Sequence, residues 1–238
     1  MHCFRVLLCV LLLAGVSAAE WNVAAYLGGA RTGNSDLGLE LPGRDTNLTF
    51  RNVAWEGRSF EGPLYYGFRF GSFPGRRFGW QTEFIHMKVY AITNRVVRVD
   101  GTLRGANAPA TVNMNNLVQR FSMSHGANLL LGNFVFRHPL WASDENRLGR
   151  VLLSARAGVG GMISHVESEV QGRTFERLAG GGFAWQLAAG GEVQLWRGVY
   201  ALGEYKYTRA QPQVIVAEGL VDTRLRSHHG VTGLSFHF

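Results

Sequence analysis

The chain has 238 residues, a formal charge of +7 and an apolar fraction of 46%. That length is enough for one domain or two small ones, and the basic balance by itself would suit a nucleic-acid partner. The sequence has no cluster of basic residues with interleaved aromatics, and its first residues indicate export, so we expect no nucleic acid. Arginine greatly outnumbers lysine, which favours planar contacts with phosphate but is equally typical of a solvated surface.

The first twenty residues have the layout of a secretory signal peptide. A short basic start precedes an apolar run over 6–16, and small residues follow up to Ala19. The run is too short to cross a bilayer as a helix. We therefore expect residues 1–19 to be cleaved and residues 20–238 to form one domain. Both cysteines lie in the cleaved segment, which excludes disulfides and thiolate chemistry from the mature chain.

The mature chain alternates apolar and polar residues with period two, in segments of about ten residues. The clearest segment, 183–196, places Trp185 and Leu187 on one face and Gln186 and Glu192 on the other. In a membrane barrel the apolar face meets lipid, while the polar and small residues fill the lumen. Export of the chain favours this interpretation over a soluble sandwich.

Eight strands are predicted, an even number as in other single-chain bacterial barrels. They cover residues 21–31, 62–73, 80–92, 123–137, 151–164, 183–196, 199–209 and 228–238. Short connections at one end alternate with long connections at the other, over residues 32–61, 93–122, 165–182 and 210–227. Short turns face the periplasm in such proteins. The expected fold is all-β, a closed antiparallel transmembrane β-barrel of about eight strands in an up-and-down meander.

The ends of the predicted strands also point to a bacterial outer membrane. Aromatic residues such as Trp21, Trp80 and Trp196 lie near strand ends, where aromatic girdles are found. The last strand alternates and ends in Phe238, which is typical of substrates of the outer-membrane assembly machinery. Because eight strands leave a lumen filled by side chains, a wide channel is excluded. We expect function at the extracellular rim or on the lipid-facing wall.

The third predicted strand carries two candidate residues. Ile85, Met87 and Val89 are expected to face lipid, so that His86 and Lys88 point into the barrel. A lysine inside a narrow barrel can neutralise a nearby carboxylate, and a histidine there can transfer protons. Both interpretations stay open from the sequence.

Further ionisable residues fall at the outer ends of other strands. His125 opens the fourth strand, His165 and Glu167 close the fifth, and Glu204 and Lys206 point inward from the seventh. Imidazole and carboxylate together can carry proton transfer, and His125, His165 and Glu167 are candidate ligands of a divalent metal. The alternatives are that the rim histidines are merely solvated and that Glu204 with Lys88 or Lys206 simply neutralises charge in the lumen.

Seven short segments carry a family resemblance. They are Trp55–Phe60, Pro63–Gly67, Glu83–Tyr90, Ser124–Asn128, Ser164–Glu167, Glu204–Tyr207 and Gly233–Phe236. Together they resemble the superfamily of small eight-stranded outer-membrane β-barrels (OmpA-like), and within it the proteins described as lipid A oxidases. The resemblance implies oxidation of the proximal glucosamine of lipid A to aminogluconate with molecular oxygen, and lipopolysaccharide as the partner of a monomeric barrel.

Matching segments supply the candidate site residues of such an oxidase. The catalytic candidates are His86, His125, His165, Glu167 and Glu204, and the substrate-binding candidates are Lys88, Asn128 and Lys206. Two other functions remain open: a non-enzymatic barrel that anchors the envelope, mediates adhesion or binds partners through its surface loops, and a small-solute channel. Histidine and glutamate side chains within about 5 Å of one another at the rim would favour the enzyme.

Overall fold

The computed structural model describes residues 19–144 and 146–238. The expected signal segment lies outside the described residues, apart from Ala19. Among the residues described, no helix has the length and apolarity that crossing a bilayer requires.

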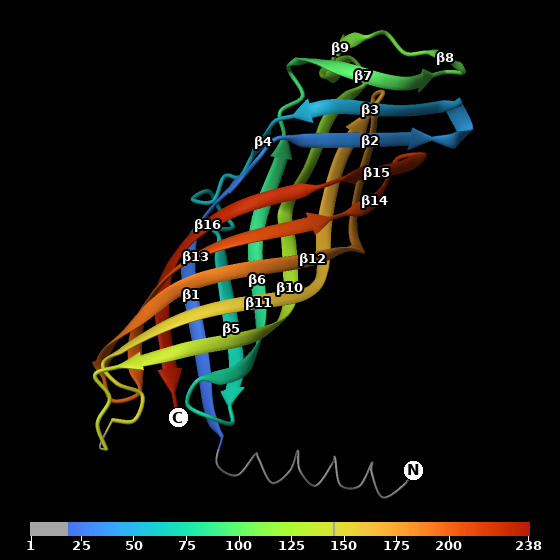
Figure 1. Cartoon of the computed structure of the whole chain (residues 1–238). Helices are drawn as coiled ribbons and strands as arrows, with labels where there is room; N and C mark the ends of the chain where they lie inside the picture. The colour runs from blue at the N-terminus through green and yellow to red at the C-terminus, as the bar shows by residue number, and fades with distance from the viewer. Residues whose placement is uncertain (1–18, 145) are drawn as a thin grey trace, which may run out of the picture.

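A closed antiparallel barrel forms the body of the molecule (Figure 1). Its eight strands are β1 (Glu20–Thr32), β5 (Tyr66–Phe73), β6 (Phe78–Ala91), β10 (Val118–Leu140), β11 (Val151–Val170), β12 (Arg173–Trp196), β13 (Val199–Gln211) and β16 (Leu225–His237). Pairing of β1 with β16 and of β6 with β10 closes the sheet. The predicted fold class is confirmed, and each predicted strand corresponds to one of these eight.

The barrel wall follows the predicted period-two alternation. On β12, Phe183, Leu187 and Val193 are exposed on the outside, whereas Gln186 and Glu192 are buried in the lumen. The same pattern on the other strands gives an outer surface of exposed leucine, valine and phenylalanine. Aromatic side chains gather towards the end that holds the C-terminus, where Trp21 stacks on Phe70 with ring centroids 5.1 Å apart. The wall therefore presents hydrocarbon outward, as a bilayer requires.

Paired charges fill the middle of the lumen. Glu83 of β6 is fully buried and accepts hydrogen bonds from Arg69 (2.8 Å) and Tyr26 (2.6 Å). Glu204 of β13 forms ion pairs with Arg69 and Arg156. Each buried charge thus has a partner of opposite sign, which is the condition for keeping ions out of water. Side chains, and not an open channel, occupy the barrel at this level.

A second sheet lies at the end of the barrel opposite the start of β1 and the C-terminus (Figure 1). In sheet order its strands are β14 (Gln213–Val216), β15 (Gly219–Thr223), β2 (Ser35–Leu41), β3 (Thr46–Val53), β7 (Val96–Leu103) and β8 (Ala106–Asn107). β9 (Thr111–Asn113) pairs with β7, and β4 (Trp55–Glu56) pairs with β6. Two 3₁₀ turns, η2 (Pro42–Arg44) and η3 (Met114–Asn116), complete the connections.

This second sheet corrects the predicted loops. The segments 32–61, 93–122 and 210–227 contain its strands, and the segment 165–182 is mostly a continuation of β11 and β12. Leucine alternation in 37–41 places its apolar side inward, against the protein, instead of outward to lipid. The period is that of a membrane strand, but the apolar face is buried against the protein core.

An apolar core joins the second sheet to the far ends of β6, β10 and β11. Its members include Leu37, Leu39, Leu41, Leu48, Phe50, Phe121, Met123, Val166 and Val170. Trp55 contacts the Phe121 ring and donates a 2.8 Å hydrogen bond to Ser35, so it ties β4, β10 and β2 together. Each buried leucine or phenylalanine contributes about 1.5–3 kcal/mol relative to an exposed one.

The predicted orientation of residues 85–89 is wrong for the same reason. Ile85, Met87 and Val89 are buried members of this core, so His86 and Lys88 lie on the opposite, outer face of β6. Beside the far end of β6 the interior is apolar, because the core beneath the second sheet fills it. An apolar side chain there gains more from facing inward than from facing lipid.

Candidate site on the outer wall

A bulge in β10 positions the first residues of the candidate site. The pairing of β10 shifts between Ser122 and Ala127 against β11, and a matching shift occurs against β6. Gly126 within the bulge has φ +135°, a conformation that side chains strongly disfavour. The extra residues turn Ser124 and His125 towards Glu167 of β11, on the outer face of the wall.

Glu167 is the centre of the contacts made by this bulge. Its Oε1 lies 2.7 Å from His125 Nδ1 and accepts a hydrogen bond from Ser124, while Arg120 approaches its other oxygen at 3.8 Å. Burial alone would raise the pKa of the Glu167 carboxyl, but the hydrogen bonds from Ser124 and His125 outweigh it and lower that pKa below its usual value. Glu167 is therefore a carboxylate at neutral pH.

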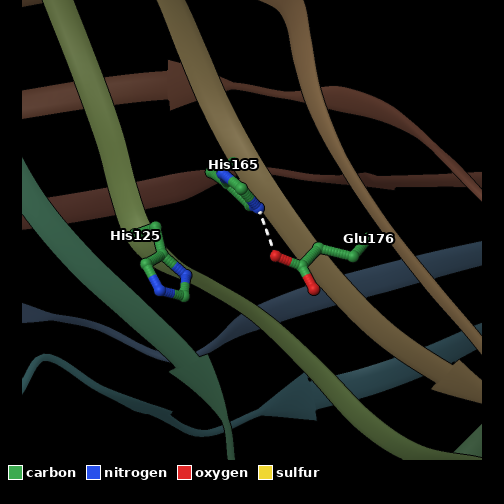
Figure 2. Close-up of side chains that lie close together, drawn as sticks. All are labelled: His125, His165 and Glu176. Atoms are coloured by element: carbon green, nitrogen blue, oxygen red, sulfur yellow. Dashed lines mark hydrogen bonds and ion pairs between the residues drawn. The ribbon is translucent and has the colours of Figure 1, made fainter.

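His165 and Glu176 extend the cluster along the β11–β12 hairpin (Figure 2). His165 Nε2 lies 2.8 Å from Glu176 Oε1, and the rings of His125 and His165 have centroids 4.9 Å apart. Glu176 lies directly across from Glu167 in the strand register. The structure thus brings together His125, His165 and Glu167, as the sequence analysis expected, and adds Glu176.

A cleft of about 780 Å³ opens beside the His125–Glu167 pair. The end of β6, the start of β10 and the segment after β4 line it. Arg120 and Arg58 contribute cationic groups, and Arg58 lies 4.3 Å above the ring of Tyr90. Guanidinium groups bind phosphate, so these two arginines suit a phosphorylated sugar; Arg58 is also ion-paired with Glu56 (3.1 Å) and already covers the Tyr90 ring.

The cluster borders the apolar part of the wall. Leu130 and Ile163, 49% and 44% exposed, lie on the side of the cluster nearer the termini, and Leu178, 62% exposed, lies directly across from His165 in the strand register. The polar groups therefore begin at the level where exposed hydrocarbon ends. That is the level at which lipid headgroups meet a barrel of this kind.

His86 and Asn128 form a separate contact on the same outer face. His86 Nδ1 lies 2.8 Å from Asn128 Oδ1, and its ring stacks on Tyr66 at 4.8 Å. His86 Nε2 is buried without a hydrogen-bond partner. Lys88 Nζ donates to the carbonyl oxygens of Glu61 (2.8 Å) and Gly62, so it anchors the segment before β5. Neither His86 nor Lys88 points into the barrel, contrary to expectation.

Glu204 and Lys206 point inward, as expected, but they belong to the charged layer of the lumen. Lys206 Nζ is fully buried, pairs with Glu83 and lies 2.7 Å from Tyr26 Oη. Glu204 is occupied by Arg69 and Arg156. Lys206 Nζ also lies 3.6 Å from Glu204, but the main partners of the two residues are Glu83 for Lys206 and the two arginines for Glu204. Both residues are thus neutralised within the lumen and are separate from the outer-wall cluster.

Sequence reasoning missed Ser124, Glu176 and the cleft arginines. Glu176 lay in a segment assigned to a loop, although Gln171-Gly172 is a short turn between alternating residues and could have indicated a hairpin. Ser124 reaches Glu167 only because of the bulge, and no pattern in the sequence predicts this bulge.

Comparisons with known proteins carry no functional assignment. No protein-family model and no curated protein matches the chain. Similar solved structures include Ail, the attachment invasion locus protein of Yersinia pestis, with 11% identity over 92% of this chain and 99% of that one (TM-score 0.39). Neisserial surface protein A has 8% identity over 93% and 97% (TM-score 0.44), and the outer membrane protease OmpT from Escherichia coli has 11% over 92% and 97% (TM-score 0.33). Similarity this low says nothing about activity, so we argue the function from this chain's own residues.

Proposed function

We propose that the protein is a bacterial outer-membrane enzyme that oxidises lipid A, and that the outer-wall cluster is its site. One observation carries the proposal: His125, His165, Glu167 and Glu176 gather at the border of the apolar wall, beside a cleft that contains two arginines. Lipid A places a phosphorylated amino sugar at this level of the outer leaflet. A polar cluster with imidazole bases there meets the sugar without removing the lipid from the membrane.

The chemistry would begin at the anomeric carbon of a lipid A whose anomeric hydroxyl is free. The Glu167 carboxylate, which lines the cleft beside His125, would accept the hydroxyl proton. The carbon–hydrogen bond would break, and its hydrogen would pass with both bonding electrons to dioxygen, which becomes hydrogen peroxide when the base gives up the first proton to it. The resulting lactone would take up water and open to the aminogluconate, so the lipid gains one oxygen atom overall. Arg58 and Arg120 would hold a phosphate of the substrate.

Closure of the barrel fits a single inserted copy. Every barrel strand has two partners, so the barrel leaves no free edge on which a second copy could add. We expect the outer-membrane assembly machinery to insert the chain as a monomer, with lipopolysaccharide as its neighbour and substrate.

Mass spectrometry of lipid A tests this function. A host that makes lipid A with a free anomeric hydroxyl should acquire a form heavier by one oxygen atom when it expresses the protein. His125→Ala and Glu167→Gln should lose this form while they still insert, as judged by heat-modifiable gel migration. His138→Ala, on the same strand but near the opposite end, is the matched control and should keep it. Unchanged lipid A in cells that contain correctly inserted wild-type protein contradicts the proposal.

A binding role of the second sheet is the other candidate function. Its outward face carries paired charges, with Arg51 held between Asp36 (2.7 Å) and Asp100 (2.6 Å). Such a fixed polar surface, raised beyond the barrel, could bind a partner or anchor the envelope. Arg51→Ala removes the cation that holds these two carboxylates in place, and it would then abolish adhesion of expressing cells and leave lipid A unaffected.

A further inference from the structure

We infer that His125, His165 and Glu176 bind a divalent transition-metal ion, with Glu167 as the residue that orients His125. The inference deepens the proposed function by naming the cofactor of that site. A catalytic role of the metal rests on the proposed function; binding of the metal does not. The sequence suggested Glu167 as the carboxylate ligand of this metal. In the structure Glu176 takes that position.

The donor set has the composition and spacing of a metal site. One ligand atom from each of the three residues lies within 4.8 Å of the other two (Figure 2). Two imidazole nitrogens and one carboxylate oxygen suit ions of the iron-to-zinc series. Donors about 2.1 Å from such an ion lie about 3.4 Å apart in a tetrahedral site, so the His165–Glu176 pair, now at 2.8 Å, has to open slightly and His125 has to move closer.

The side chains have the freedom for this adjustment. His125 and Glu176 each have 61% of the side chain exposed, while the buried neighbours of the hairpin hold the backbone in register. Rotation about side-chain bonds is therefore enough, and no strand has to move. Three protein ligands leave one position open for water or for a substrate oxygen.

Glu167 supplies the second feature of a metal site. Metal-binding histidines commonly donate their other ring N–H to a carboxylate, which fixes the ring and strengthens the ligand. His125 Nδ1 lies 2.7 Å from Glu167 Oε1, and Ser124 holds that same oxygen. In this arrangement Nε2 of His125 is the nitrogen left for the ion. Glu167 is thus a positioning residue in the proposed site.

Zinc titration of the purified full-length protein in detergent tests the site. Isothermal titration calorimetry after chelator treatment should show one Zn²⁺ per chain. His165→Ala and Glu176→Gln should weaken binding by at least tenfold, and Glu167→Gln should weaken it less. His228→Ala is the matched control, since His228 is an exposed outer-wall histidine that contacts Tyr205 away from the cluster. Absence of zinc binding by the wild type, or equal binding by His165→Ala, overturns the inference.

Cobalt gives a readout of the ligands themselves. Co²⁺ bound through nitrogen and oxygen donors should give visible absorption in the wild type that His125→Ala and Glu176→Gln lose. Lipid A analysis then separates the two proposals. Oxidation by metal-free protein removes the metal inference and leaves the function intact, whereas metal binding with unchanged lipid A removes the function and leaves the metal site.

Discussion

At the residue scale, Glu167 determines how the outer-wall cluster responds to pH. Its carboxylate accepts hydrogen bonds from Ser124 and His125. These two hydrogen bonds exist in this form only while Glu167 is ionised. Because the folded pKa of Glu167 is lowered, the ionised contact adds stability above the usual value of 4.5. That contribution is lost as the pH falls from 4.5 through the lowered folded pKa.

The carboxyl carbon of Glu167 should therefore titrate below pH 4.5 in the folded protein. Nuclear magnetic resonance of glutamate-labelled protein in micelles measures this, with Glu167→Gln to assign the signal. The ring signals of His125 should change over the same pH range in the wild type, and this component should be missing in Glu167→Gln. A Glu167 carboxyl that titrates at 4.5 or above contradicts the hydrogen-bonded arrangement.

The sequence could predict part of the cluster at this scale. His125, His165 and Glu167 fall at the same end of two adjacent predicted strands, and neighbouring strands in a meander place such residues together. Glu176 required knowing that β11 and β12 continue beyond the membrane wall. The hydrogen bond from Ser124 required the bulge, which depends on how β10 pairs with two neighbours at once.

At the element scale, the second sheet is held by an apolar core inside the protein. The lipid-facing wall of the barrel is not part of this core. Leu39 and Leu48 pair across β2 and β3 and are almost fully buried. Truncating Leu48 to alanine leaves a cavity and should cost about 2–5 kcal/mol. The barrel strands below keep their own pairing, so the loss should fall on the second sheet.

Limited proteolysis of the purified protein checks this expectation. Leu48→Ala should be cut within the second sheet at a protease concentration that leaves the wild type intact, while the barrel keeps heat-modifiable migration. Leu130→Ala is the matched control, because Leu130 is half exposed on the outer wall, where detergent covers the truncated side chain. Equal resistance of Leu48→Ala and wild type would show that the second sheet does not need this core.

The eight barrel strands were predictable because each of them alternates with period two over most of its length. The second sheet was not, although 37–41 and 46–50 also alternate with period two. A period-two pattern gives the two faces of a strand, but it does not tell whether the apolar face meets lipid or a protein core. Only the pairing of β2 with β3 and β15, all outside the barrel sheet, decides between them.

At the scale of the whole molecule, the interior changes character along the barrel axis. The middle level holds Glu83, Arg69 and Lys206, and the far level holds the apolar core beneath the second sheet. This change explains why β6 carries glutamate at position 83 but isoleucine at 85 and methionine at 87 on the same face. The simple rule that inward residues are polar and outward residues are apolar therefore does not hold along the whole of β6.

The charged layer should contribute strongly to stability through Glu83. This residue accepts hydrogen bonds from Tyr26, Arg69 and Lys206, all buried. Glu83→Gln keeps the shape of the side chain but removes the negative charge that pairs with Arg69 and Lys206. Breaking a buried ion pair in this way costs about 3–5 kcal/mol. The free energy of unfolding in detergent, from urea titration of tryptophan fluorescence, should fall by that amount. Glu40→Gln, on the exposed face of β2, should leave it unchanged. An unchanged urea midpoint for Glu83→Gln would mean that the lumen cations have enough other partners, with Glu204 as the first to examine.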